Sequence, residues 1–322
     1  MDKNIFSAVK AADRAYLERA ISSREAVPDQ RDQNGNTLMH IAVELKRNEL
    51  AILELLISNG WDVNSQNNLG ATPLHYVALR KDSGRPVALL LLKNLANTQI
   101  STNLGHTPLH LACERYKLEL VQVLLEHKAI PGSMDRNNNT PLHVLLLSQG
   151  RDTVAREIVE VLIKGGARLD TKNCEGNDSL LLASSRGFTR VCQLLLQNGS
   201  NPRITNDFGN TVVHLSSAAG HSELVEMLLE LEMPYINVTN ADGDTPLHLA
   251  VKNNHAEVAA VLIKKGSSIA TKNAAGKSPL DLVSQDEKSI FAVKHPELIK
   301  LISSRKPKSK VPEEEDIGCL IF

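Results

Sequence analysis

The chain has 322 residues, and its 36 basic and 37 acidic side chains give a formal net charge of −1. Aromatic residues make up 3% of the sequence, whereas apolar residues make up 42%. An electrostatic grip on nucleic acid needs a clear basic excess, and base stacking needs aromatic side chains. The composition therefore argues against nucleic acid as a partner, while its apolar fraction is ample for a packed core.

We expect neither a signal peptide nor a membrane-spanning segment. The longest uninterrupted apolar stretch covers residues 87–92, whereas a membrane span needs about 20 residues. The cysteines form no Cys-x-x-Cys pair and have no histidines at zinc-finger spacing, which favours free thiols in a reducing compartment. They are Cys113, Cys174, Cys192 and Cys319.

A four-residue motif recurs along the chain at steps of 33 to 38 residues. Four copies read Thr-Pro-Leu-His, and the other four are variants of that sequence. Thr favours the N-cap of a helix and Pro favours its first turn, so each copy predicts the start of a helix. The copies begin at Thr37, Thr72, Thr107, Thr140, Asp178, Thr211, Thr245 and Ser278.

Glycines and a second apolar helix complete each predicted unit. The residue two positions before each motif predicts a tight turn with positive φ; it is Asn138 once and otherwise Gly35, Gly70, Gly105, Gly176, Gly209, Gly243 or Gly276. Apolar residues at three- and four-residue spacing then predict a second helix, which stacking on neighbouring units would bury. A left-handed cap is expected to end it at Gly60, Gly166, Gly199 and Gly266. The 38-residue step is assigned to extra residues at 148–153 between two helices, with a smaller insertion at 81–86.

The period and the Thr-Pro-Leu-His signature resemble the ankyrin repeat over nearly the whole chain. This resemblance implies an all-α solenoid of about nine helix-turn-helix units, joined by β-turn loops and covering residues 1–303. Residues 1–31 are expected to form an N-terminal capping unit and residues 279–303 a closing unit. The resemblance also implies that the motif histidines bond the backbone of a neighbouring turn. These are His40, His75, His110, His143, His214 and His248.

Residues 304–322 lose the periodicity and contain prolines, a basic run and an acidic run, so we expect a disordered tail. The final Cys-Leu-Ile-Phe resembles a CaaX prenylation box, and its terminal Phe favours geranylgeranyl over farnesyl. The resemblance implies a thioether at Cys319, removal of the last three residues and carboxyl methylation. Basic residues in the tail would add a second membrane signal, which the acidic residues 313–316 would partly offset. The basic residues are Arg305, Lys306, Lys308 and Lys310. The alternative is an apolar C-terminus that docks on the last repeat.

Binding residues are expected on the loop tips and first helices, which line the concave face of such an array. Leu69, Leu104 and Phe208 are apolar tip residues and form a candidate contact row, although isolated exposed apolar residues are also ordinary. Six basic residues late in the first helices would favour an acidic partner segment if they align. They are Lys46, Arg47, Arg80, Lys81, Arg115 and Lys117. The sequence around Asn64 is similar to that preferred by asparaginyl hydroxylases, although Asp-Val-Asn is also ordinary turn chemistry.

We find no metalloprotease, nucleophile-elbow, phosphate-loop or dinucleotide motif, and we therefore expect no catalysis, no cofactor and no metal site. The sequence predicts a monomeric protein-binding scaffold in the cytoplasm, held on the cytosolic face of a membrane by a lipid that a prenyltransferase adds at Cys319. One alternative is a soluble cytosolic adaptor or inhibitor whose CaaX-like end is unused. Another is a prenylated bacterial ankyrin effector that acts in a host cell. An enzyme built on an unfamiliar site is the reading that the motifs favour least.

Overall fold

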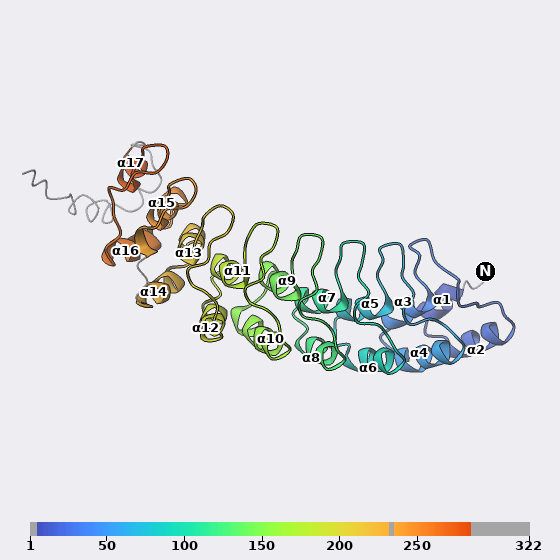
Figure 1. Ribbon diagram of the computed structural model, residues 1–322. Coiled ribbons are helices and arrows are strands. Elements are labelled where there is room, and N and C mark those ends of the chain that lie inside the picture. The colour runs from blue at the N-terminus through green and yellow to red at the C-terminus, as the bar shows by residue number, and fades with distance from the viewer. Residues whose placement is uncertain (1–4, 232–234, 285–322) are drawn as a thin grey trace, which may run out of the picture. The chain divides into compact units, whose positions relative to one another are not determined.

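The computed structural model describes residues 5–231 and 235–284, and within these ranges the chain is helical with no strand (Figure 1). Its compact units are residues 1–216 and residues 217–322, and their boundary falls within α13 (Val212–Ala219). The expected closing unit beyond Ser284 and the whole predicted tail lie outside the described residues. The site residues concerned are Cys319, Arg305, Lys306, Lys308 and Lys310.

Helices follow one another in pairs. In the first unit they are α1 (Ile5–Lys10), α2 (Arg14–Ser22), α3 (Leu38–Val43), α4 (Glu49–Ser58), α5 (Pro73–Leu79), α6 (Arg85–Lys93), α7 (Pro108–Glu114), α8 (Leu118–Glu126), α9 (Pro141–Leu147), α10 (Asp152–Lys164), α11 (Ser179–Ser185) and α12 (Thr189–Gln197). Beyond α13 they are α14 (Ser222–Glu230), the 3-10 helix η1 (Tyr235–Asn237), α15 (Pro246–Lys252), α16 (Ala256–Lys264) and α17 (Pro279–Ser284). Each odd-numbered helix from α3 to α17 begins at one motif, as the sequence predicts. The pair α1 and α2 lies within residues 1–31, and the capping role of this segment stays a prediction.

Within the first unit, the odd-numbered helices form one row and the even-numbered helices a second row (Figure 1). We call the long loops that lead from one pair to the next fingers; they are residues 23–37, 59–72, 94–107, 127–140, 165–178 and 198–211. We call the short connections inside each pair edge loops; they are residues 11–13, 44–48, 80–84, 115–117, 148–151 and 186–188. Fingers and edge loops lie at opposite ends of the odd-numbered helices, so side chains on them belong to different surfaces.

Each motif builds a helix start and a bond to the next unit at the same time. The N–H of Thr72 donates to Nδ1 of His75 at 3.0 Å, and the Thr72 side chain completes a capping box with the first turn of α5. Because Nδ1 accepts, the ring hydrogen lies on Nε2, which donates to the carbonyl of His106 at 3.0 Å. The same arrangement recurs at His40, His110 and His248. The predicted backbone bond is thereby confirmed for these histidines and for His143, whereas for His214 it stays a prediction.

The glycines before the motifs have two functions, of which the sequence revealed one. Gly70 has a φ of +73°, as predicted, and Asn138 replaces glycine with a φ of +58°. A Cβ at Gly70 would also lie 2.9 Å from the backbone nitrogen of Asn103 on the next finger. That nitrogen donates to the carbonyl of Leu69 at 2.8 Å. The missing side chain thus lets neighbouring fingers approach closely enough to bond.

The core lies between the two rows of helices and between successive units. Leu74 of α5 and Leu109 of α7 are buried from the first row, and Leu53 of α4 and Leu91 of α6 are buried from the second. Each α-helix of the described residues is short, from six to thirteen residues, so its stability depends on contact with neighbouring helices. Trp61 is also buried, in agreement with a packing role rather than a ligand platform.

The assignment of the 38-residue step is wrong in one respect. The connection 148–151 has four residues, which is no longer than the five-residue connections 44–48 and 80–84. The additional residues instead extend α10, which has 13 residues where α8 and α12 have nine. Helical continuation satisfies the backbone of the insertion, whereas a longer loop would leave its polar groups to water. Of the smaller insertion predicted at 81–86, residues 81–84 lie in the connection, whereas Arg85 and Pro86 begin α6.

We expect Gly70→Ala to destabilise the protein clearly more than Gly60→Ala. Both glycines have positive φ, so both substitutions add strain of about 1 kcal/mol. Only at Gly70 would the methyl group overlap the next finger, because nothing lies within 4 Å of a Cβ at Gly60. Urea unfolding at equilibrium measures the difference. Equal losses in the two variants would show that the close approach of the fingers has no energetic weight.

We also expect stability to fall as the pH is lowered from 7.5 to 5. Burial lowers the pKa of His75 and of His110 to about 4, so between pH 6.5 and 4 the unfolded chain binds protons that the folded chain excludes. Burial raises the pKa of Asp178 to about 6, which acts in the opposite direction and offsets part of the loss. The net loss of unfolding free energy at pH 5 is about 2–3 kcal/mol.

The variant Asp178→Asn provides the control for this pH dependence. Asn also caps helices well, but it does not titrate, so the difference between pH 7.5 and pH 5 should grow in this variant. Urea midpoints at the two pH values measure both effects. A wild type that is equally stable at pH 5 and 7.5 would contradict the expected protonation of the unfolded histidines.

Candidate functional site

The fingers present exposed apolar side chains at two neighbouring positions. Leu69 is 67% exposed and Leu104 is 62% exposed, and the bond from Asn103 N–H to the Leu69 carbonyl holds their fingers side by side. Phe208 is 59% exposed. It stands three fingers beyond Leu104, and the two fingers between them carry polar residues at the corresponding position. The predicted contact row is therefore a pair, Leu69 and Leu104, with Phe208 apart from it.

Two further exposed leucines lie on the first row of helices, and sequence reasoning did not single them out. Leu79 is the last residue of α5 and is 45% exposed, and Leu147 is the last residue of α9 and is 46% exposed. The same repeat position is Glu44, directly after α3, and Glu114, the last residue of α7. The sequence did contain a signal for these leucines. A repeat position that is an acid in neighbouring units is exposed, so a leucine at that position is exposed as well.

The six predicted basic residues do not lie late in the first helices. All of them follow those helices and belong to edge loops. Lys46, Arg47, Lys81 and Arg115 are exposed there, as a binding strip requires. Lys117 is partly buried, and its Nζ donates to the carbonyl of Asp82 at 2.7 Å. The predicted placement of these residues within helices is wrong, and their service as one binding strip stays a prediction.

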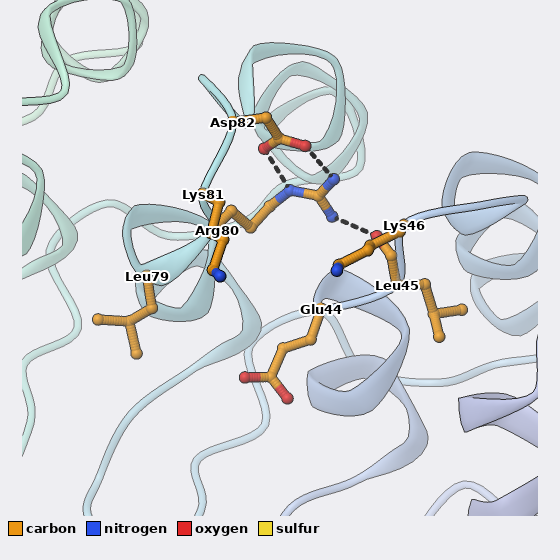
Figure 2. Close-up of a pocket in the computed structure, with 7 residues that line it drawn as sticks. All are labelled: Glu44, Leu45, Lys46, Leu79, Arg80, Lys81 and Asp82. Carbon is orange, nitrogen blue, oxygen red and sulfur yellow. Dashed lines mark hydrogen bonds and ion pairs between the residues drawn. The ribbon is translucent and has the colours of Figure 1, made fainter.

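Arg80 is not part of an exposed strip, and this prediction is corrected by the structure. Its side chain is 6% exposed, and Figure 2 shows the guanidinium turned towards Asp82 and the backbone of Leu45. Nε and Nη2 donate to the two carboxylate oxygens of Asp82 at 2.7 and 2.6 Å, and Nη1 donates to the carbonyls of Leu45, at 3.0 Å, and Val43. Glu49 lies 3.6 Å from Nη2. Arg80 therefore satisfies carbonyls at the end of α3, in the preceding unit.

A shallow cavity of about 330 Å³ lies beside Arg80. Its lining combines leucines with charged side chains (Figure 2) and consists of Glu44, Leu45, Lys46, Leu79, Arg80, Lys81 and Asp82. The hydrogen bond from Arg80 lowers the pKa of the Asp82 carboxyl, whereas burial raises the pKa of Glu44. These shifts describe an ion-paired loop rather than a general acid and base in contact with each other.

The cysteines and the possible metal ligands form no catalytic arrangement in the described residues. Cys113 and Cys192 are buried, and burial raises the pKa of Cys192 to about 12, so this thiol is protonated at neutral pH. Cys174 is exposed on a finger. Within residues 5–231 and 235–284, no three His, Cys, Asp or Glu side chains are grouped to hold a metal ion. None of the helices described is long and apolar enough to cross a bilayer.

Asn64 connects two consecutive fingers. Its side-chain Nδ2 donates to the Leu95 carbonyl at 3.0 Å, and its Oδ1 accepts from the N–H of Asn97 at 2.7 Å. Asn64 is partly buried, and its own N–H donates to Asp62. The side chain therefore has a structural role between units, and its hydroxylation stays a prediction.

The structure shows repeated helix pairs, motif histidines that bond the next unit, and fingers that bond one another. Comparison with known proteins tests which family has this architecture. The family profile described as ankyrin repeats (3 copies) matches residues 5–102, 77–173 and 180–273. The chain belongs to the ankyrin-repeat family. Its all-α solenoid fold is thereby confirmed, and the chain is a module for protein–protein interaction.

The matches between this ankyrin-repeat chain and its relatives cover only part of each protein. It is 30% identical to the B-cell lymphoma 3 protein homolog of Mus musculus over 225 residues, which are 66% of the chain and 48% of that protein. It is 33% identical to the E3 ubiquitin-protein ligase KEG of Arabidopsis thaliana over 199 residues, which are 59% of the chain and 12% of the ligase. The chain thus spans half or less of either relative's length.

A solved structure agrees with the fold. The crystal structure of the human ASB11 ankyrin repeat domain superposes with a TM-score of 0.62 at 24% sequence identity. The match covers 73% of this chain and 98% of that domain. At this identity the likeness shows the architecture alone, so the surface of this chain has to be interpreted from its own residues.

We expect Arg80→Met to lower the unfolding free energy by about 2–3 kcal/mol, because it leaves two carbonyls and the Asp82 carboxylate without their buried donor. The neighbouring Lys81→Met is the matched control. Its side chain makes no hydrogen bond or ion pair in the described residues, so we expect a change within about 0.5 kcal/mol. Urea unfolding of both variants checks the assignment, which equal losses would contradict.

Proposed function

We propose that this chain is a non-catalytic scaffold that binds a protein partner through its fingers and first helices, while a prenyl group on Cys319 holds it on the cytosolic face of a membrane. The binding part is supported by Leu69 and Leu104, which are more than 60% exposed on neighbouring fingers. Exposed leucines at fixed spacing suit an apolar segment of a partner. Leu79 and Leu147 are further exposed leucines, at the ends of α5 and α9 that lie away from the fingers.

The tethering part is supported by the sequence alone. Cys319 is followed by two aliphatic residues and a final Phe, which fits a CaaX box with a preference for geranylgeranyl. A single lipid chain gives only marginal, reversible binding, so a second membrane signal is needed for stable attachment. Arg305, Lys306, Lys308 and Lys310 would contribute about 1 kcal/mol each near an anionic leaflet, and the four acids at 313–316 would offset much of it.

We expect the full chain, expressed in eukaryotic cells, to carry a prenyl mass increment and to sediment with membranes. Cys319→Ser should remove both properties, because the serine hydroxyl is not the thioether acceptor. Cys174→Ser, at an exposed thiol on a finger, is the matched control and should change neither. Intact-mass measurement and membrane fractionation read the result.

A wild type without the mass increment that stays in the soluble fraction would overturn the tether. The binding surface on the fingers would then belong to a soluble adaptor or inhibitor, which is the second function that the sequence allows. The origin of the chain, in a eukaryote or in a bacterium that uses a host prenyltransferase, does not change either outcome, because the modified atom is the same.

A further inference from the structure

The edge loops of the first unit carry an excess of positive charge. The six loops contain eight basic and three acidic side chains. The basic residues are Lys46, Arg47, Arg80, Lys81, Arg115, Lys117, Arg151 and Arg186, and the acidic residues are Asp13, Glu44 and Asp82. A sequence with a net charge of −1 therefore concentrates positive charge at one edge of this unit.

The fingers of the same unit show no such excess. They contain seven basic and nine acidic side chains, which are Arg24, Arg31, Lys128, Arg136, Arg168, Lys172 and Arg203 against Glu25, Asp29, Asp32, Asp62, Asp135, Asp170, Glu175, Asp178 and Asp207. Edge loops and fingers lie at opposite ends of the first-row helices. The charge of the unit is thus polarised along these helices, with the excess of positive charge at the end away from the fingers.

Two of the three acids of the edge already accept hydrogen bonds. Asp13 accepts from the N–H of Tyr16 at 3.0 Å and caps α2. Both carboxylate oxygens of Asp82 accept from Arg80. Partial desolvation raises the pKa of the Glu44 carboxyl from its ordinary value. Asp82 forms its ion pair with the buried Arg80, and it has no ion pair with an exposed cation of the edge loops in the described residues.

Four of the cations point to no partner in the described residues. Lys46, Arg47, Lys81 and Arg151 are exposed, and their side chains form no ion pair and no hydrogen bond there. They occupy three of the edge loops, and adjacent loops are one repeat apart, which is roughly 10 Å for packed helices. Arg115 joins them, because its contact with Glu114 is 3.7 Å long and half exposed. The result is a row of single cations at the spacing of the repeat.

From this row we infer that the edge loops of the first unit form an electrostatic contact surface for an anionic membrane leaflet. A leaflet presents negative headgroups continuously, so each cation is neutralised wherever it stands. An acidic peptide would need carboxylates matched to a step of roughly 10 Å, and the cavity beside Arg80 is shallow and is itself lined by two acids. The inference rests on the proposed function in one respect, since a lipid at Cys319 would bring the edge to the same surface.

The test uses the unlipidated full chain and vesicles of phosphatidylcholine with or without about one-third phosphatidylserine. We expect binding to the anionic vesicles that weakens steeply between about 0.1 M and about 0.5 M salt. The triple variant Lys46→Glu, Arg47→Glu, Lys81→Glu should bind the anionic vesicles at least about tenfold more weakly. Circular dichroism and urea midpoints verify that the variant is folded.

The matched control changes the same number of charges on other surfaces of the same unit, by Lys93→Glu, Lys128→Glu, Arg136→Glu. These residues are exposed and have no side-chain partner in the residues described, so we expect vesicle binding within about twofold of the wild type. Equal losses in the two triple variants would overturn the inference, because net charge alone would then explain binding. So would a wild type that ignores phosphatidylserine vesicles but binds a soluble poly-glutamate peptide through the same three residues.

The two proposals fail separately. If Cys319→Ser releases the protein from cell membranes and the edge variant binds vesicles like the wild type, the tether stands and the edge surface is wrong. If the unlipidated chain binds anionic vesicles through the edge and no prenyl group is found in cells, the edge surface stands and the tether is wrong.

Discussion

The rest of the structure depends on one hydrogen bond, which five of the six motif histidines donate to a carbonyl of the next unit. It requires a neutral ring with its hydrogen on Nε2, and burial favours that form by lowering the pKa of the histidines. Side chains at the bases of the fingers add further polar contacts between consecutive units. They pair Asn36 with Asn67, His106 with Asp135, Asn139 with Asn173, Asn177 with Asn206 and Asp244 with Asn273. Polar groups that single units would leave buried and unsatisfied thus hold the array in register.

This register turns sequence position into surface position. Leu69 and Leu104 occupy the same position of consecutive repeats, so the bond between their fingers makes them neighbours. The edge loops work in the same way, because one repeat step separates each cation from its counterpart. A partner surface of an ankyrin-repeat protein is therefore read across repeats rather than along the chain. In this chain the two surfaces differ: the fingers offer leucines in a charge-balanced setting, and the edge offers cations.

Side chains of the edge loops also stabilise the first unit, in roles that the amino-acid sequence does not reveal. Arg80 reaches back to the carbonyls of the preceding unit, and Tyr116 reaches forward, with its hydroxyl 2.8 Å from the Leu145 carbonyl. The Tyr116 ring lies where a Cβ on Gly150 would be, which explains the glycine in that loop. Arg186 donates to the Ser148 carbonyl at 3.2 Å. These contacts satisfy carbonyls at helix C-termini, which have no partner within their own helix.

The sequence by itself determined the helix starts and the positive-φ turns, because capping, proline geometry and glycine conformation act within a few residues. The role of the motif histidines came from the family resemblance, since their carbonyl partners lie 28 to 34 residues away in the sequence. It also determined the family, since eight motifs in phase specify one architecture. Only the tertiary structure decided that the long step extends α10 and that Arg80 is buried while Lys81 is free. Adjacent and equally basic residues differ there, because the direction of a side chain depends on the carbonyls and carboxylates that the preceding unit places within its reach.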